Sequence, residues 1–300
     1  MRRGGRVTLI GAAGAVALLV VAGSAGAAFP GQNGRIAFDR YTGGDDEIFT
    51  MSGHGQNQVP LTDNDLSDRN PVYSANANRI VFQRDVGGDS EIFSMDAAGG
   101  HLNRLTDNDA GDFEPSYSPS GERIAFESNR TTTGNPTGDS EIWSMRKDGT
   151  DVRQLTDNTV QDNDPDWSPD GARIVFSRAD TDIIVMHADG SHEKNLTDNG
   201  FFEDDPDWSP NGRRIVYASY RGGDVEIFSV PGRGGKERPL TDNGAGDDQP
   251  AYSPDGESIV FASDRGGGDT DIFRMDADGH HPERVTRNNK DEESPDWGVH

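Results

Sequence analysis

A short apolar segment of the form Ile-x-Phe, preceded by a polar residue, recurs six times along the chain. β-Branched and aromatic runs of this length, separated by turns such as Asp-Gly and Asn-Gly, predict antiparallel hairpins. Because the unit repeats, its period determines the fold more strongly than any local propensity. The six copies span residues 35–38, 79–82, 123–126, 173–176, 214–217 and 258–261.

Four short strands make up each unit, and no segment has a sustained helical period, so the predicted fold class is all-β. We call them strand a (Pro-x-Trp or Pro-x-Tyr), strand b (Ile-x-Phe), strand c (an acid followed by Ile) and strand d (ending before a Thr). The acids that open strand c are Glu47, Glu91, Glu141, Asp182, Glu226 and Asp271.

The spacing between these strands is almost constant. The strand c acid precedes the Thr of the following turn by 15 positions in all six units, as in Glu47 and Thr62, and that Thr precedes the strand a Pro by 9. Only the distance from the strand b Ile to the strand c acid changes, through 11, 11, 17, 8, 11 and 12 positions. We therefore expect the b–c loops to determine specificity, because loops vary while a scaffold stays fixed.

The first unit begins at strand b and the last ends at strand a, around Pro295 and Trp297. A linear array would leave that final strand unpaired and exposed. A closed ring lets it complete the first unit and removes the exposed edge. The sequence thus predicts a single six-bladed β-propeller with four-stranded blades, in which the C-terminal strand pairs into the N-terminal blade.

The combined motif, from Leu-Thr-Asp-Asn through Pro-x-Trp-Ser-Pro-Asp-Gly and Ile-x-Phe to Glu-Ile-Phe-x-Met-Asp, resembles the WD-like propeller repeat of the TolB family. The resemblance covers residues 34–297. It implies a propeller whose innermost strand is strand a, and a role as a binding scaffold. Fold resemblance alone does not identify a partner.

The N-terminus has the pattern of a secretory signal. Basic residues 2–6 precede an apolar run over residues 7–21 and a small-residue cleavage site at residues 25–27. We expect a cleaved signal over residues 1–28, a short linker over residues 29–33 and the propeller over residues 34–298. The mature protein is then secreted or periplasmic, with no transmembrane span, and the sequence leaves the Sec and twin-arginine routes open.

The composition is strongly acidic, with 28 Lys+Arg against 53 Asp+Glu and a formal net charge of −25. This balance argues against nucleic acid and anionic membranes as partners, because both require clustered Lys and Arg.

The chain has no cysteine, so disulfides and thiolate chemistry are absent. A protein or peptide partner, itself basic, fits this charge, and we expect the propeller to be monomeric.

An acid stands three residues before each strand a Pro, and we call these six residues the ring acids. Because the d–a loop leads inward, we expect them at the mouth of the central tunnel, with the further acids Glu114, Asp164 and Asp205 beside them, as a cation- or peptide-binding surface. Calcium is one such cation. The alternative is that each acid accepts backbone N–H bonds in its own turn. The ring acids are Asp68, Asp112, Asp162, Glu203, Asp247 and Glu292.

Each unit also carries an arginine after strand b and an acid at the start of strand c. We expect structural ion pairs between these two positions, as in the pairs Arg84 and Glu91, Arg130 and Glu141, and Arg221 and Glu226.

No catalytic motif stands out. The sequence has no Gly-x-Ser-x-Gly elbow and no His-x-x-x-His zinc pattern. We therefore expect a non-catalytic binding module. Two alternatives remain at this point: a propeller enzyme of the lactonase, lyase or glycan hydrolase type, with a metal held by acids such as Asp112, Asp162 and Glu203, and a purely structural envelope component.

Overall fold

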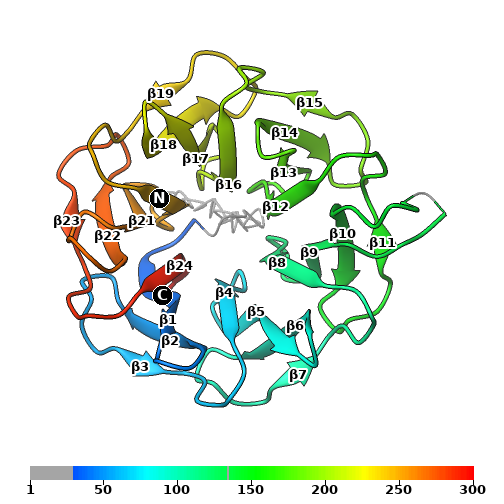
Figure 1. Ribbon diagram of the computed structural model, residues 1–300, viewed down its shortest axis with the longest axis horizontal. Coiled ribbons are helices and arrows are strands. Elements are labelled where there is room, and N and C mark those ends of the chain that lie inside the picture. Colours follow the sequence, from blue (N-terminus) through cyan, green and yellow to red (C-terminus); the bar gives the residue numbers. More distant parts are fainter. Residues whose placement is uncertain (1–29, 134) are drawn as a thin grey trace, which may run out of the picture.

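The computed structural model describes residues 30–133 and 135–300, and these form six four-stranded antiparallel sheets arranged in a ring (Figure 1). The predicted six-bladed propeller is confirmed. The predicted signal peptide, residues 1–28, lies outside the described residues. In the part of the chain that the structure describes, no helix has the length and apolar character needed to cross a membrane.

Strand a is innermost in every blade and strand d is outermost. From blade 1 to blade 6, strands a are β24 (Glu292–Val299), β4 (Asp68–Tyr73), β8 (Asp112–Tyr117), β12 (Asp162–Trp167), β16 (Phe202–Trp208) and β20 (Asp247–Tyr252). Strands b are β1 (Asn33–Tyr41), β5 (Arg79–Val86), β9 (Arg123–Ser128), β13 (Arg173–Arg178), β17 (Arg214–Arg221) and β21 (Ser258–Ser263).

The outer two strands of each blade together contain fewer residues than the inner two, because strand d is short. Strands c are β2 (Asp46–Ser52), β6 (Asp89–Asp96), β10 (Glu141–Arg146), β14 (Asp182–His187), β18 (Asp224–Pro231) and β22 (Asp271–Asp276). Strands d contain only two residues each, which leaves little free edge for pairing with another chain. They are β3 (Val59–Pro60), β7 (Asn103–Arg104), β11 (Arg153–Gln154), β15 (Lys194–Asn195), β19 (Arg238–Pro239) and β23 (Glu283–Arg284).

The core consists of apolar layers between neighbouring blades. Alternation along strand b sends Ile80 and Phe82 into the layer shared with blade 1, whereas Val81, between them, packs in the layer shared with blade 3. Each Ile-x-Phe segment therefore fills two layers at once. This explains how a chain with only 31% hydrophobic residues stays folded.

A threonine hydroxyl explains the constant spacing between strand c and the following turn. Thr62 Oγ1 accepts the backbone N–H of Ile48 at 2.8 Å, and Thr106 Oγ1 accepts that of Ile92 at the same distance. The same bond occurs in the other four blades. This hydrogen bond satisfies a strand c backbone N–H at the point where the short strand d ends. A shift in the register between strands c and d would break it.

The ring closes as predicted. β24 pairs antiparallel with β1, with Ile36 opposite Trp297 and Ala37 opposite Asp296. Trp297 is buried in the layer between blades 6 and 1, together with Phe38, Met51 and other residues of both blades. The first and last strands thus hold the ring together through one sheet and one apolar layer.

We predict that Trp297→Ala destabilises the protein by about 3–5 kcal/mol, because it removes a fully packed indole from the layer that closes the ring. Urea unfolding followed by tryptophan fluorescence and circular dichroism measures the change. Tyr41→Ala, at an exposed position of the same blade, serves as the control and should change stability by less than about 0.5 kcal/mol. Equal effects of the two substitutions would contradict the assigned role of the closing strand.

Candidate functional site: a carboxylate-lined channel

The six ring acids are fully buried, and none of them lines the central channel. Each binds one arginine of its own blade, with nitrogen–oxygen distances of 2.5 to 2.7 Å in five of the six pairs. The pairs are Asp68 with Arg84, Asp112 with Arg130, Asp162 with Arg178, Glu203 with Arg221, Asp247 with Arg265 and Glu292 with Arg40.

This placement corrects the expectation of an open ring of these six carboxylates at the tunnel mouth. A carboxylate without a partner is very costly to bury, so a fully buried acid needs a cation close by. The ring acids are therefore neutralised inside the blades. They stabilise the architecture rather than line the channel.

The arginine reaches its ring acid from one of two positions on or just after strand b. In blades 1, 2 and 4 it stands directly opposite the acid, as Arg84 does opposite Asp68. In blades 3, 5 and 6 a serine takes that place and the arginine follows two residues later, which in blades 3 and 6 is beyond the end of strand b. There the serine joins the network, since Ser128 Oγ donates to Asp112 at 2.5 Å.

The predicted pairing of these arginines with the strand c acids is also corrected. Arg84 lies between Asp68 of strand a and Glu91 of strand c in the register, and it binds Asp68 through two N–H donors. Its guanidinium lies over the rings of Phe82 and Phe93 at 5.5 and 5.1 Å from their centroids. Arg130 and Arg221 likewise pair with their ring acids, not with Glu141 and Glu226.

The four strand c glutamates instead bind the Asn of the Leu-Thr-Asp-Asn turn. The backbone N–H of Asn108 donates to Glu91 at 2.9 Å, and that of Asn158 donates to Glu141 at 2.7 Å. Glu226 accepts the same bond from Asn243. Each Asn side chain also donates to the ring acid, as Asn108 does to Asp112 at 2.9 Å. One asparagine thus connects the strand c acid of one blade to the ring acid of the next blade.

The channel is lined by the residues directly before each strand a proline. Each of these residues has a positive φ, between 44° and 53°, and each stands at a β-bulge in the pairing of strands a and b. A bulge redirects one side chain, and proline removes the N–H that regular pairing would need. The six residues are Asn70, Glu114, Asp164, Asp205, Gln249 and Ser294.

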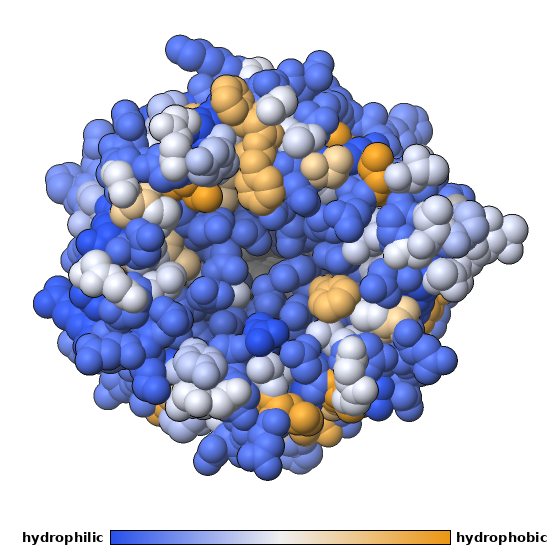
Figure 2. All heavy atoms as spheres, in the orientation of Figure 1, coloured by the Kyte–Doolittle hydropathy of each residue, from blue (hydrophilic) through white to orange (hydrophobic). Residues whose placement is uncertain are grey.

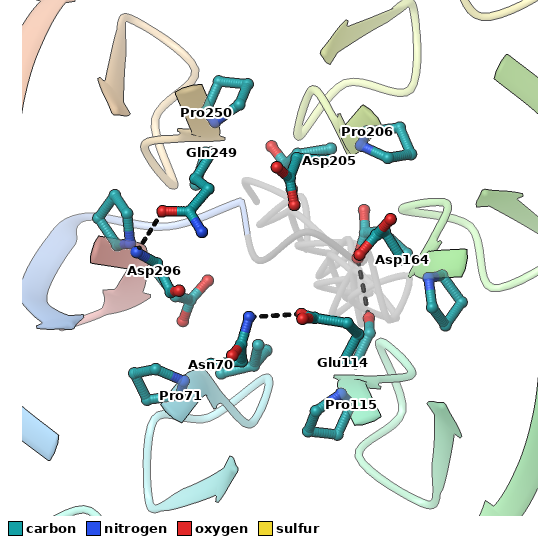
Figure 3. Close-up of a pocket in the computed structure, with 18 residues that line it drawn as sticks. Asn70, Pro71, Glu114, Pro115, Asp164, Asp205, Pro206, Gln249, Pro250 and Asp296 are labelled. Carbon is teal, nitrogen blue, oxygen red and sulfur yellow. Dashed lines mark hydrogen bonds between the residues drawn. The ribbon is translucent and has the colours of Figure 1, made fainter. Parts of the chain in front are cut away.

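Three of these side chains are acidic, and they come from three adjacent blades. Glu114, Asp164 and Asp205 extend into the channel from β8, β12 and β16 (Figure 3). The remaining three positions carry neutral side chains, and Asn70 donates its amide to Glu114 at 2.5 Å. At these six positions the acids therefore lie on one side of a channel of about 130 Å³.

A second layer of acids lies two residues further along strand a. Asp166, Asp207 and Asp296 line the same channel, and each accepts a backbone N–H from the next blade. The donors are Trp208 at 3.1 Å, Tyr252 at 2.8 Å and Tyr73 at 2.8 Å, respectively. These carboxylates connect neighbouring strands a across the channel wall.

Within residues 30–133 and 135–300, no Lys or Arg lines the channel, and none of its acids forms an ion pair. Burial raises the pKa of Glu114 to about 8 and that of Asp296 to about 7. Burial, followed by repulsion from Asp204, raises the pKa of Asp164 and Asp205 well above the ordinary range. The channel thus contains carboxyl groups whose charge is not compensated by the protein.

The described residues show no group of three or more His, Cys, Asp or Glu side chains arranged to hold a metal ion. Asp112, Asp162 and Glu203, the acids suggested for a metal, each bind the arginine of a different blade and do not converge. The structure does not bring together the predicted metal-ligand set.

The face that carries the b–c and d–a loops also exposes several large apolar side chains. They are Tyr41, Leu66, Val160, Phe201, Phe202 and Tyr220. On the face shown in Figure 2, hydrophobic side chains gather near β16, and the hollow at the centre is bordered mainly by hydrophilic residues. An apolar group next to a charged hollow is typical of a protein-interaction surface.

The protein is thus a six-bladed propeller, a closed ring of four-stranded blades around a central channel. The sequence profile of the TolB beta propeller domain matches residues 26–234 and 206–300, so the chain belongs to that family. No curated protein sequence matches it. The predicted family resemblance is confirmed.

Solved structures with the same fold include proteins of different function. TolB from Acinetobacter baumannii has a TM-score of 0.76 at 20% identity, covering 89% of this chain and 67% of that one. A TolB-type protein from Agrobacterium tumefaciens has a TM-score of 0.68 at 23% identity, covering 84% and 88%. Oligogalacturonate lyase in complex with manganese has a TM-score of 0.58 at 13% identity, covering 85% and 76%. At these identities the likeness shows the fold alone.

Sequence reasoning placed Glu114, Asp164 and Asp205 near the tunnel mouth but did not single out Asp166, Asp207 or Asp296 as channel residues. The sequence feature that could have identified the channel positions is the proline within each strand a. Because proline within a sheet is confined to edge strands and bulges, the residue before it is a candidate for a change of direction.

We predict that the double substitution Asp164→Asn and Asp205→Asn stabilises the protein by about 1–3 kcal/mol at pH 8. Both carboxyls have a folded pKa above the unfolded value, so stability is lost as pH rises from about 4 through the folded pKa. The gain should therefore shrink toward zero near pH 4. Asparagine tolerates the positive φ at both positions.

Asp68→Asn is the matched control for this stability measurement, since it makes the same change at a ring acid. It leaves Arg84 buried without its partner and should destabilise the protein by about 3 kcal/mol at pH 8. Thermal unfolding across pH 4–9 measures both variants. A destabilised double variant at pH 8 would show that the channel charges are compensated.

Proposed function

We propose that the protein is an exported, non-catalytic binding module that captures a positively charged segment of a partner protein at its channel. The observation that carries this proposal is the contrast between two sets of acids. Every ring acid has its own arginine, whereas the channel acids have no cation among the described residues.

This contrast favours a ligand because, among the described residues, the channel acids have no cationic partner whereas every ring acid has one. Carboxylates held around a low-dielectric hollow focus a negative potential toward its mouth. A partner's ammonium or guanidinium group would relieve the repulsion among Glu114, Asp164 and Asp205 and lower their pKa values toward the ordinary range. Long-range attraction by a chain of net charge −25 would speed the encounter.

The place of action follows from the N-terminal pattern. Residues 1–28 have the basic, apolar and small-residue regions of a secretory signal, and we place the mature propeller outside the cytoplasm, as a monomer. The partner is therefore a secreted, periplasmic or membrane-attached protein with an accessible basic segment. Its identity does not follow from the fold.

An enzymatic role is the alternative, since one structural neighbour is an oligogalacturonate lyase in complex with manganese. That likeness concerns the fold at 13% identity. The channel carboxyls contact backbone N–H groups, serine hydroxyls and neighbouring side chains, as Asp166 contacts Ser116 at 2.9 Å. This arrangement supports charge attraction better than a defined reaction centre.

We predict that the mature protein binds a fluorescent hexalysine amide, measured by fluorescence anisotropy at low ionic strength. At pH 9, where more of the channel carboxyls are ionised, Asp164→Asn with Asp205→Asn should weaken binding about tenfold, because it removes negative charge from the channel. The control is Asp276→Asn with Asp278→Asn, which removes the same charge from an exposed c–d turn of blade 6 and should weaken binding less than twofold. Equal losses in the two variants, or no binding of hexalysine at all, would overturn the proposal.

Binding should also depend on pH in a defined direction. Asp166, Asp296 and Glu114 have pKa values of about 6, 7 and 8, all raised mainly by burial. Each group is neutral below its pKa and negative above it, so affinity for hexalysine should increase from pH 5 to pH 9. A flat profile over that range would show that the surface acids, which ionise near pH 4, account for the binding.

A further inference from the structure

A cleft opens between blades 3 and 4 on the face that carries the a–b and c–d turns. Its volume is about 550 Å³, and it is lined by the two a–b turns, by Arg123, Ser144 and Arg153 of blade 3, and by Trp167 and the c–d turn of blade 4. Ser144 pairs with both Ala125 and Arg153, and Ala125 packs in the layer shared with blade 4. The side chains of this row therefore point toward blade 4. We call this hollow the 3–4 cleft.

Contacts between the blades close both ends of the 3–4 cleft. At the inner end the a–b turns touch, since a Cβ at Gly171 would lie 3.2 Å from Cγ of Pro119. At the outer end the c–d turn of blade 4 touches strand d of blade 3, since a Cβ at Gly190 would overlap Leu155 O. The cleft is thus a bounded hollow with a volume typical of ligand sites.

Strand a carries a tryptophan two residues after its proline in three blades, and two of these tryptophans have an arginine of the preceding blade at the neighbouring c–d turn. Arg173 Nη1 donates to Gly232 O at 3.1 Å, and its guanidinium lies 4.4 Å from the ring centroid of Trp208. Between blades 6 and 1, Arg274 Nη1 donates to Gly53 O at 3.4 Å. Gly53 and Gly232 hold corresponding positions, six residues after the acid that opens strand c.

The third tryptophan, Trp167, has no arginine in this place. The corresponding carbonyl belongs to Ala188, and within residues 30–133 and 135–300 no group donates a hydrogen bond to it. Arg123, which could reach across, stays in blade 3. Its Nη2 donates to Ser144 Oγ at 3.0 Å and its Nη1 donates to Asp151 at 2.9 Å.

One residue of strand c explains why the two interfaces differ. Val185 holds in blade 4 the position that Ser144 holds in blade 3, three residues after the strand c acid. Because a valine side chain accepts no hydrogen bond, Arg173 finds its acceptor in the next blade. The serine instead retains Arg123 in its own blade, so no guanidinium of the described chain fills the space beside Trp167.

Two acids of blade 4 stand at the opening of this unfilled space, and we call them the rim acids. They are Asp170 in the a–b turn and Asp189 in the c–d turn. Each caps its own turn through Oδ1, and neither forms an ion pair with a described Lys or Arg. The arginines of the blade 3 wall have Asp151 as their counterion. At the filled interface the corresponding positions hold Asn211 and Arg233, so the acids occur where the chain supplies no cation of its own.

We propose that the 3–4 cleft binds the guanidinium group of a ligand, in the place that arginines of this chain occupy at the other two tryptophans. The planar cation would lie against the indole of Trp167, donate to Ala188 O and pair with the rim acids. An ammonium group fits less well, because it lacks the flat face and the parallel donors. This site is separate from the channel and does not depend on the function proposed there.

The test measures binding of agmatine and cadaverine to the mature protein by isothermal titration calorimetry. Both probes are dications of similar length, and only agmatine carries a guanidinium. Agmatine should bind about tenfold more tightly than cadaverine. Asp170→Asn with Asp189→Asn should abolish this preference, because it removes the charge of the rim acids. Asparagine keeps the bonds of both turns, so the variant should fold normally, and its melting temperature checks this.

Asp255→Asn with Asp278→Asn is the matched control, since these acids hold the corresponding turn positions of blade 6, where strand a carries Tyr252. It should leave the preference for agmatine intact, as should Asp164→Asn with Asp205→Asn in the channel. No binding of agmatine, equal affinity for the two probes, or an equal loss in the rim and control variants would show that the inference is wrong.

A second pair of probes separates the two sources of a guanidinium, a free small molecule and an arginine of a partner protein. These probes are acetylated Gly-Arg-Gly amide and acetylated Gly-Lys-Gly amide. If the arginine peptide binds more tightly, and the rim variant removes the difference, the cleft also accepts a partner's side chain. If agmatine alone shows the preference, the ligand is a free guanidine.

Discussion

The buried pairing of a strand b arginine with the acid at the start of strand a determines where the other charges of each blade lie. The ring acid is fully buried and its arginine lies on the adjacent strand, so the pair must form inside the blade. The Asn of the d–a turn then joins the ring acid to the strand c acid of the preceding blade, as Asn158 joins Asp162 to Glu141. Since this network includes strands a, b and c, it holds the loops of one face at fixed positions.

The same network makes the channel distinctive. Six acids that the sequence places near the centre are neutralised, so the field at the channel comes from a different set of acids with no arginine of its own. Glu114, Asp164 and Asp205 repel one another at the bulges of their strands, and this repulsion lowers the stability of the folded protein. Natural proteins tolerate such local conflicts mainly at sites that bind or react.

The fold could be predicted almost completely from the sequence, because it depends on spacing. The constant distance from Glu47 to Thr62 reflects a hydrogen bond between the Thr hydroxyl and the strand c backbone, and the position of Trp297 at the chain end indicates ring closure. Both features depend on the number of residues between two positions, and that number can be counted directly in the sequence.

The site was harder to predict, because a sequence shows where an acid lies along a strand and not which way it points. Asp162 and Asp164 stand two residues apart, and regular alternation would place them on the same face. The bulge at Asp164 breaks that alternation and turns it into the channel, while Asp162 stays with Arg178 inside the blade. Likewise, Arg84 has an acid opposite it on both sides, and only the three-dimensional contacts decide between Asp68 and Glu91.

The bulge before each proline has a consequence for how such a channel can change. It presents one side chain per blade to the bore, while the paired strands around it keep their hydrogen bonds. The six present residues, from Asn70 to Ser294, already include acids, amides and a hydroxyl on the same backbone. The channel lining therefore consists of six exchangeable positions. A substitution at any one of them can change the chemistry of the channel at that blade while the ring of blades keeps its structure.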